Sequence, residues 1–281
     1  MLQSIPIELI ATGLFLFGLI IGSFLNVVIY RVPRRESIIL PASHCIGCGA
    51  QVKPYDNIPL LSYAILKGRC RNCKQPISLI YPFVELLTGV LFALAFIKDG
   101  LSWSLIPDLA FIAAIIALIF IDYNHRILPN VITYPGLAIA IVVRVWLPSL
   151  EGTWILRQAL ASPDWPDWLL SLVNALVGAL VGGGALWFVR WLYFVWKRVE
   201  GMGLGDIKMM AMIGAYLGWQ LTLLTIFLGS LLGSVVGIYL ILSRGYNTKF
   251  EMPFGIFLGV AAVIALFAGW PILNWYSGLF K

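Results

Sequence analysis

The sequence predicts an all-α polytopic membrane protein with about eight transmembrane helices and one small polar domain between the first two. Three observations support this prediction. Hydrophobic residues make up 60% of the 281 residues and charged residues only 11%, and the mean hydropathy is +0.93. Long apolar segments recur along the chain, and all four cysteines lie in one long polar region. Soluble proteins carry about 25% charged residues, so the bilayer is the expected solvent.

Eight segments are apolar enough to form membrane helices, for which a full crossing takes about 20 residues. We expect them at residues 7–29, 80–97, 105–122, 130–147, 169–195, 206–219, 221–242 and 254–276. The sixth is short and is either a half-helix or a re-entrant segment. In the fifth, the run "LVGALVGGGALW" at 176–187 supplies small residues for close helix packing. The first precedes its basic residues, unlike a cleavable signal, so we interpret it as a retained span.

The distribution of Lys and Arg predicts which side of the membrane each loop occupies, because loops rich in these residues stay in the cytosol. If the amino terminus lies outside, the inner loops collect most of the 19 basic residues. They are Arg31, Arg34, Arg35, Lys53, Lys67, Arg69, Arg71, Lys74, Arg126, Lys197, Arg198, Lys208, Arg244 and Lys249. The net charge of +6 is therefore an orientation signal, and no nucleic-acid partner is needed to explain it.

Only residues 31–79 form a polar region large enough to fold separately, which divides the chain into a first helix at 1–30, this cytosolic loop, and a helical core at 80–281. The loop contains two Cys-x-x-Cys motifs, in "CIGCGAQV" at 45–52 and "CRNCKQPI" at 70–77. Four thiolates at this spacing are typical of a structural Zn²⁺ site. Since the cytosol keeps thiols reduced, disulfides are the weaker interpretation.

The expected zinc ligands are Cys45, Cys48, Cys70 and Cys73. Four sulfur ligands leave no open position for water, so we expect the metal to organise the loop while the chemistry lies elsewhere. His44 precedes the first pair and is an alternative ligand, although an ordinary loop residue is the simpler interpretation. Four free thiols are the remaining alternative.

Three acidic residues adjoin apolar segments on the predicted inner side: Glu85, Asp122 and Asp206. A charged side chain in the middle of a span costs roughly 2.5–3.5 kcal/mol on insertion scales, so such residues usually have a function. Asp122 also fits a helix-end acid solvated by headgroups, and Asp206 an N-cap of the following helix. The topology places both aspartates at the inner boundary, where helix packing can bring them together.

Two neighbouring carboxyls cannot both ionise cheaply, so they share a proton and titrate as a unit. The ionised one activates water and the protonated one donates to the scissile carbonyl oxygen, which is the arrangement of aspartic proteases. Gly201, Gly203 and Gly205, just before Asp206, let the backbone approach an extended peptide closely. We expect Lys208 to be an inside-facing anchor, with attraction of substrate carboxylates or lipid headgroups as the alternative.

Several segments, in order, resemble the prepilin leader peptidases, a bacterial family of polytopic aspartic proteases. "GSFLNVVIYRVPR" at 22–34 resembles the first-span signature, residues 45–89 the two-knuckle cytosolic domain, and "PFGIFLG" at 253–259 the last-span motif. "IDYNHRILPN" at 121–130 and "GMGLGDIK" at 201–208 resemble the segments that hold the two catalytic aspartates. The ordered set covers nearly the whole chain and is very specific.

The resemblance implies that Asp122 and Asp206 cleave the basic leader of type IV prepilins or pseudopilins at the cytosolic face of the bacterial inner membrane. It also implies methylation of the new amino terminus by S-adenosylmethionine, although the sequence shows no clear motif for this cofactor. Glu85 matches the family's "YP…E" segment and is assigned only a role in a polar site. Many relatives have Leu-Pro-Asp where this chain has Leu-Pro-Asn, so Asn130 cannot act as a carboxylate.

Two other classes of function fit the same features. A cation-coupled transporter with a zinc-stabilised loop would place its intramembrane acids similarly, but it predicts two inverted halves that we do not find. A structural subunit of a secretion system would use the acids as helix caps. Membrane lipids are expected partners in every case, and the sequence indicates neither the oligomeric state nor the pathway.

Overall fold

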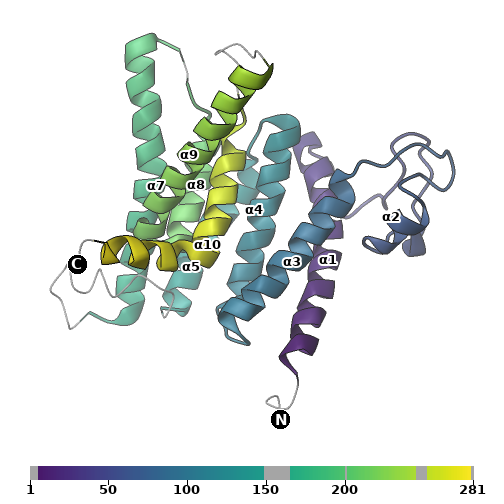
Figure 1. Ribbon diagram of the computed structural model, residues 1–281, viewed down its shortest axis with the longest axis horizontal. Helices are drawn as coiled ribbons and strands as arrows, with labels where there is room; N and C mark the ends of the chain where they lie inside the picture. Colours follow the sequence, from purple (N-terminus) through teal and green to yellow (C-terminus); the bar gives the residue numbers. More distant parts are fainter. Residues whose placement is uncertain (1–5, 149–164, 200, 245–251, 280–281) are drawn as a thin grey trace. The chain divides into compact units, whose positions relative to one another are not determined.

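The computed structural model describes residues 6–148, 165–199, 201–244 and 252–279 (Figure 1). In these ranges the chain is helical, and its only β-type pairings are two isolated bridges. The chain divides into two compact units, Met1–Ala117 and Leu118–Lys281. Lys249 of the last predicted inner loop lies outside the described residues.

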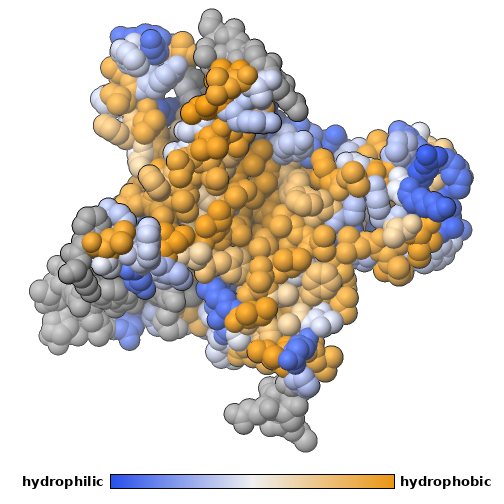
Figure 2. Space-filling model, in the orientation of Figure 1, coloured by the Kyte–Doolittle hydropathy of each residue, from blue (hydrophilic) through white to orange (hydrophobic). Residues whose placement is uncertain are grey.

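All eight predicted helices are present in the described part of the chain. They are α1 (Ile7–Arg31), α3 (Ile80–Asp99), α4 (Leu105–His125), α5 (Asn130–Trp146), α7 (Asp167–Lys197), α8 (Leu204–Leu217), α9 (Trp219–Arg244) and α10 (Phe254–Gly278). Six of them are long and apolar enough to cross a membrane, whereas α5 and α8 are shorter. Hydrophobic side chains cover much of their visible surface (Figure 2), as expected of helices that face lipid.

In the first unit, α1 and α3 pack closely against each other. A β-carbon on Gly18 would lie 2.7 Å from the Cα atom of Gly89, and one on Gly22 would lie 2.6 Å from the Cα atom of Glu85. Only glycine permits so close an approach of two backbones, which is the usual way in which helices associate in lipid.

The polar loop between α1 and α3 contains one short helix, α2 (Leu61–Ile65), and two 3-10 turns. The start of the polar loop is held by Arg31, a buried residue at the end of α1. Its guanidinium donates to the carbonyl oxygens of Ser37 (2.9 Å) and Pro41 (2.7 Å). These bonds satisfy backbone acceptors that no regular structure pairs. The loop is therefore an ordered extension of the first helix pair.

In the second unit, the short helix α8 contacts α5, α7, α9 and α10 (Figure 1), and most of its residues from Met209 onward are buried. Gly178 of α7 and Gly214 of α8 touch through their backbones, and a β-carbon on either would collide with the carbonyl oxygen of the other. Gly182 meets the carbonyl of Met210 in the same way. This confirms the close packing predicted for the small-residue run at 176–187.

The carboxyl end of α8 is closed by a buried cation. Arg144 of α5 donates from Nε to the carbonyl oxygen of Tyr216 at 2.8 Å. The last carbonyls of a helix lack helical partners and carry partial negative charge, so a guanidinium there stabilises the end. Gly218 follows with a φ of 82°, and α9 begins at the next residue. With only 14 residues, α8 spans about 21 Å, and it is the short helix predicted for the sixth segment.

Candidate functional site

Asp206 lies in the first turn of α8, at the end of the glycine-rich entry. Gly203 is the N-cap residue with an extended backbone, and its N–H donates to the carboxylate of Asp206. The alternative that Asp206 is itself the N-cap is therefore wrong: it is the third helical residue and bonds back to the cap, as in a capping box. The first turn of a helix carries partial positive charge, which stabilises a carboxylate there. Helix α8 therefore itself stabilises the carboxylate of Asp206.

The glycine-rich entry to α8 is fixed by α7. Nη1 of Arg190 donates to the carbonyl oxygen of Met202 at 2.8 Å. A β-carbon on Gly201 would lie 2.5 Å from Cδ1 of Tyr193, so the entry passes directly over that ring. The backbone that positions Asp206 is thus supported by a hydrogen bond and by a steric contact.

Asp122 lies in the last turn of α4, and only 5% of its surface is exposed. The backbone N–H groups of Gly255 and Ile256, at the start of α10, donate to its carboxylate. Its Oδ2 atom is buried and has no hydrogen-bond partner among the described residues. An unsatisfied buried acceptor costs about 1–3 kcal/mol, so this oxygen is a site for a further proton, a water molecule or a ligand.

The structure brings the two aspartates together beside Gly255. A β-carbon at this position would lie 2.8 Å from Oδ2 of Asp122 and 3.2 Å from Oδ1 of Asp206. The two oxygens are therefore at most 6.0 Å apart, the sum of these two distances, which a single bridging water molecule can span. Helices α4, α8 and α10 meet at this point. The catalytic use of the two aspartates stays a prediction.

Leu128, in the connection from α4 to α5, forms an apolar wall beside the pair. Its side chain lies 2.9 Å from the β-carbon position of Gly205 and 3.1 Å from that of Gly255. Both glycines adjoin an aspartate, in sequence or in space. Leu128 and Gly255 belong to the segments "ILPN" and "PFG", which resemble parts of family motifs, but the sequence alone indicates no role for either residue. A glycine two residues after the proline that precedes α10 was the available signal.

Lys208 ties the start of α8 to the start of α5. Its Nζ donates to Oδ1 of Asn130 at 2.9 Å and lies 5.2 Å from the centre of the Tyr134 ring. The predicted anchor is therefore a link between two helices. Asn130, which cannot act as a carboxylate, serves as the neutral acceptor of this link, a role that the sequence alone does not indicate.

Glu85 belongs to the first unit, where it joins the polar loop to α3. Its Oε2 accepts the backbone N–H of Leu60 at 2.9 Å, and the side chain of Ser23 also bonds to it. Leu60 has a φ of 58° and directly precedes α2. Through these contacts Glu85 joins the polar loop to α3. The role in a polar site that the resemblance implied stays a prediction.

The four cysteines converge in the polar loop, and all four Sγ atoms lie within 4.8 Å of one another. The two knuckles repeat one hydrogen-bond pattern: the N–H of Cys45 donates to Ala50 at 2.8 Å, and that of Cys70 to Gln75 at 2.9 Å. Hydrogen bonds from the backbone of Cys73 and Asn72 lower the pKa of the Cys70 thiol to about 6, whereas burial and the three neighbouring thiols raise the pKa of Cys73 to about 11. The cluster can hold a metal ion, since thiolates are the binding form.

The cluster contains sulfur ligands only. His44 lies outside it, and its Nδ1 is 3.4 Å from the carbonyl oxygen of Ala42. The alternative of His44 as a ligand therefore finds no support in the geometry. Asn72 instead donates from Nδ2 to Sγ of Cys48 at 3.7 Å, which is the kind of outer contact that orients a metal ligand.

Comparison with known proteins identifies the family. Residues 16–98 match the bacterial peptidase A24 N-terminal domain, and residues 109–238 match the type IV leader peptidase family. A relative from Pseudomonas putida is 36% identical over 90% of this chain and 88% of its own length. The chain belongs to the type IV leader peptidase family. The resemblance predicted from the sequence motifs is thus confirmed.

Other relatives of this leader peptidase are similar to the same extent. One from Aeromonas hydrophila is 37% identical over 93% of this chain and 92% of its own length, and one from Pseudomonas aeruginosa is 35% identical over 98% and 96%. All three relatives carry the name prepilin leader peptidase/N-methyltransferase. No solved structure matches the chain.

The two family matches divide the functional residues between them. The four cysteines and Glu85 lie in the N-terminal match, and both aspartates lie in the type IV leader peptidase match. Together with the six long apolar helices, family membership makes the chain a multi-pass inner-membrane protein.

Proposed function

We propose that this leader peptidase removes the basic leader from type IV prepilins or pseudopilins and methylates the new amino terminus, with Asp122 and Asp206 as the catalytic pair. The observation that carries the peptidase assignment is the convergence of the two carboxylate oxygens on Gly255. The names of the relatives support both activities and favour them over a transporter or a structural subunit.

The pair supports peptide hydrolysis by general acid–base catalysis. Two carboxyls this close hold one proton between them. The ionised member removes a proton from water, and the water oxygen attacks the scissile carbonyl carbon. The protonated member donates to the carbonyl oxygen, and a proton then passes to the leaving nitrogen as the C–N bond breaks. Gly205 and Gly255 have no side chains, so Leu128 can lie against the first and the two carboxyls against the second.

We propose Zn²⁺ as the ion of the four-cysteine cluster. In a tetrahedral Zn–S₄ site the sulfurs lie about 3.8 Å apart, as follows from Zn–S bonds of about 2.3 Å. Sγ of Cys45 and Sγ of Cys73 are 3.7 Å apart, which supports this choice. The ion would fix the two knuckles to each other. With four protein ligands it leaves no open position for a reacting water, so its role is structural.

The charge distribution supports an orientation with the amino terminus outside and both the zinc domain and the aspartate pair at the cytosolic face. A prepilin presents its basic leader on that side, next to an apolar helix, so the pair is placed where the bond to be cut enters the membrane. S-adenosylmethionine supplies the methyl group when it is bound, and we assign no residues to it.

Mass spectrometry of a prepilin treated with the purified leader peptidase in detergent tests the proposed function. With S-adenosylmethionine present, the product should lack the leader and carry one added methyl group. Without the cofactor, the leader should still be removed and the methyl group should be missing. An unchanged prepilin in both reactions, with a folded enzyme, would reject the proposal.

A further inference from the structure

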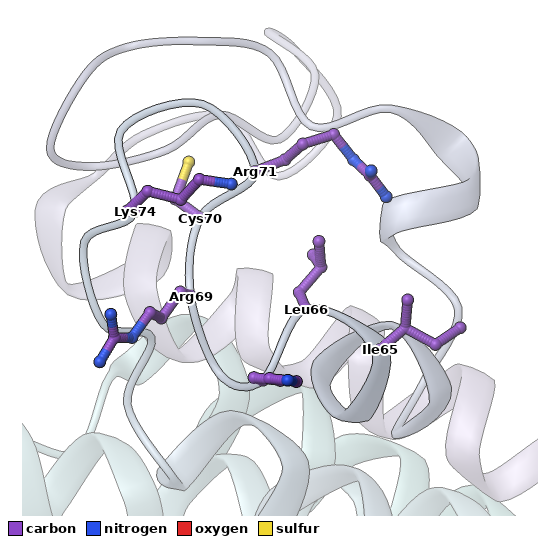
Figure 3. A pocket seen from close by; sticks show the side chains of 7 residues that line it. Ile65, Leu66, Arg69, Cys70, Arg71 and Lys74 are labelled. Carbon is purple, nitrogen blue, oxygen red and sulfur yellow. The ribbon is translucent and has the colours of Figure 1, made fainter.

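The polar loop of the first unit carries a cationic hollow that the proposed function does not use. The hollow has a volume of about 490 Å³ and is lined by Ile65, Leu66, Lys67, Arg69, Cys70, Arg71 and Lys74 (Figure 3). Arg71 is paired with Asp56, with Nη2 2.6 Å from Oδ1. Lys67, Arg69 and Lys74 are exposed and have no acidic partner among the described residues. Three cations therefore stand free to bind an anion.

Apolar side chains adjoin these cations. Leu61 and Ile65 are one turn apart on α2 and so share one face of this helix. Their surfaces are 53% and 66% exposed, respectively, in the part of the chain that the structure describes. A soluble anion would leave these apolar side chains exposed to water, whereas a phospholipid offers a phosphate to the cations and an acyl chain to the apolar face.

The contact of Glu85 holds the start of α2, and with it this apolar face, against α3. Glu85 is the sixth residue of α3, and it binds the N–H of Leu60, which directly precedes α2. At 1.5 Å per residue, Glu85 lies about 7.5 Å along α3 from its first residue, so the start of α2 is bonded to the side of this membrane helix. Interfacial helices bury their apolar face about 5–10 Å into the boundary between headgroups and acyl chains.

We propose that residues 58–74 form a membrane-interface anchor that binds the phosphate headgroup of an anionic phospholipid. Leu61 and Ile65 enter the acyl boundary, and Lys67, Arg69 and Lys74 bind the phosphate. Each cation near an anionic leaflet strengthens such binding about fivefold. Because both ends of the loop continue into membrane helices, the anchor stays at one face of the bilayer, and its position does not depend on the peptidase assignment.

Hydrogen exchange of the full chain in nanodiscs tests this anchor. We compare discs of phosphatidylcholine alone with discs that also contain phosphatidylglycerol. The amides of residues 58–74 should exchange several-fold more slowly in the anionic discs. Inorganic phosphate added to the phosphatidylcholine discs should not reproduce this protection. If it does, the site binds free phosphate and the lipid proposal is overturned.

The test variant carries Lys67→Asn, Arg69→Gln and Lys74→Asn, because Lys67 and Lys74 have positive φ and Asn tolerates this conformation. The matched control carries Arg35→Asn, Lys197→Gln and Arg198→Asn, which removes the same charge and again places Asn at two positive-φ positions. The test variant should lose the difference between the discs, while the control keeps it.

Elemental analysis should give the same metal content for both variants, which shows that the test variant remains folded in the loop. Equal exchange in the two kinds of disc for the unmodified chain would overturn the proposal. An equal loss in the test and control variants would also overturn it, because the effect would then reflect total charge alone.

Discussion

Gly255 leaves room for the two carboxyls only because it has no side chain. The oxygens of Asp122 and Asp206 face it, and Leu128 closes the same space. The two aspartates were predictable because acids beside apolar segments are rare and costly. Gly255 and Leu128 were not, because their roles depend on how α10 and the α4–α5 connection pack, and neither residue type has a chemistry that marks it.

The substitution Gly255→Ala tests this geometry. The added β-carbon would press on both carboxyl oxygens, so leader cleavage should fall about 100-fold, since a misplacement of about 1 Å costs that much. Alanine favours a helix over glycine by about 1 kcal/mol, so the fold should persist. Gly184→Ala, where a β-carbon meets nothing within 4 Å, should cleave normally. Cleavage at the unmodified rate by Gly255→Ala would show that the oxygens do not lie against this residue.

At the scale of elements, α8 is a short helix whose two ends are fixed by its neighbours. Arg144 of α5 binds its last turn, and Arg190 of α7 binds the loop before its first turn. The sequence predicted its length and the close packing of the 176–187 run. It did not predict that α8 is the partner of that run, because a helix buried in protein and one that faces lipid are equally apolar.

Overpacking of the contact between α7 and α8 should destabilise the second unit. In Gly178→Leu the side chain collides with the backbone of Gly214, and we expect a loss of about 1–3 kcal/mol. Gly184→Leu on the same helix has open space around it and should raise stability by up to about 1 kcal/mol, because glycine is a poor helix former. Thermal unfolding in detergent measures both. Equal midpoints for the two variants would contradict the packing described for α8.

At the scale of the whole molecule, the four cysteines lie in one compact unit and the two aspartates in the other. The eight helices and the cysteine loop were predictable, because hydropathy and paired Cys-x-x-Cys spacing are local signals. The bond between Glu85 and Leu60 was not, since it depends on how the loop folds back on α3. The division into residues 1–30, 31–79 and 80–281 stays a prediction.

Loss of the metal should therefore affect the loop more than the hydrolytic pair. By elemental analysis, the unmodified chain should carry about one metal ion and the variant Cys70→Ser/Cys73→Ser none, and the variant should unfold at a lower temperature. We expect methylation to fall more than leader cleavage. His44→Ala should keep the ion, because this side chain lies outside the sulfur cluster. A selective loss of cleavage with the loop still folded would contradict this separation of roles.

The central claim is that Asp122 and Asp206 act as one catalytic unit. Its most direct test is the rate of prepilin cleavage by Asp122→Asn, Asp206→Asn and the double variant, with Asp56→Asn as a control carboxyl in the polar loop. Each single substitution should lower the rate by about 10³-fold or more. The double variant should be no slower than the single ones, because residues that act together are not additive. Cleavage at the unmodified rate by either single variant, or losses that multiply in the double variant, would contradict the claim.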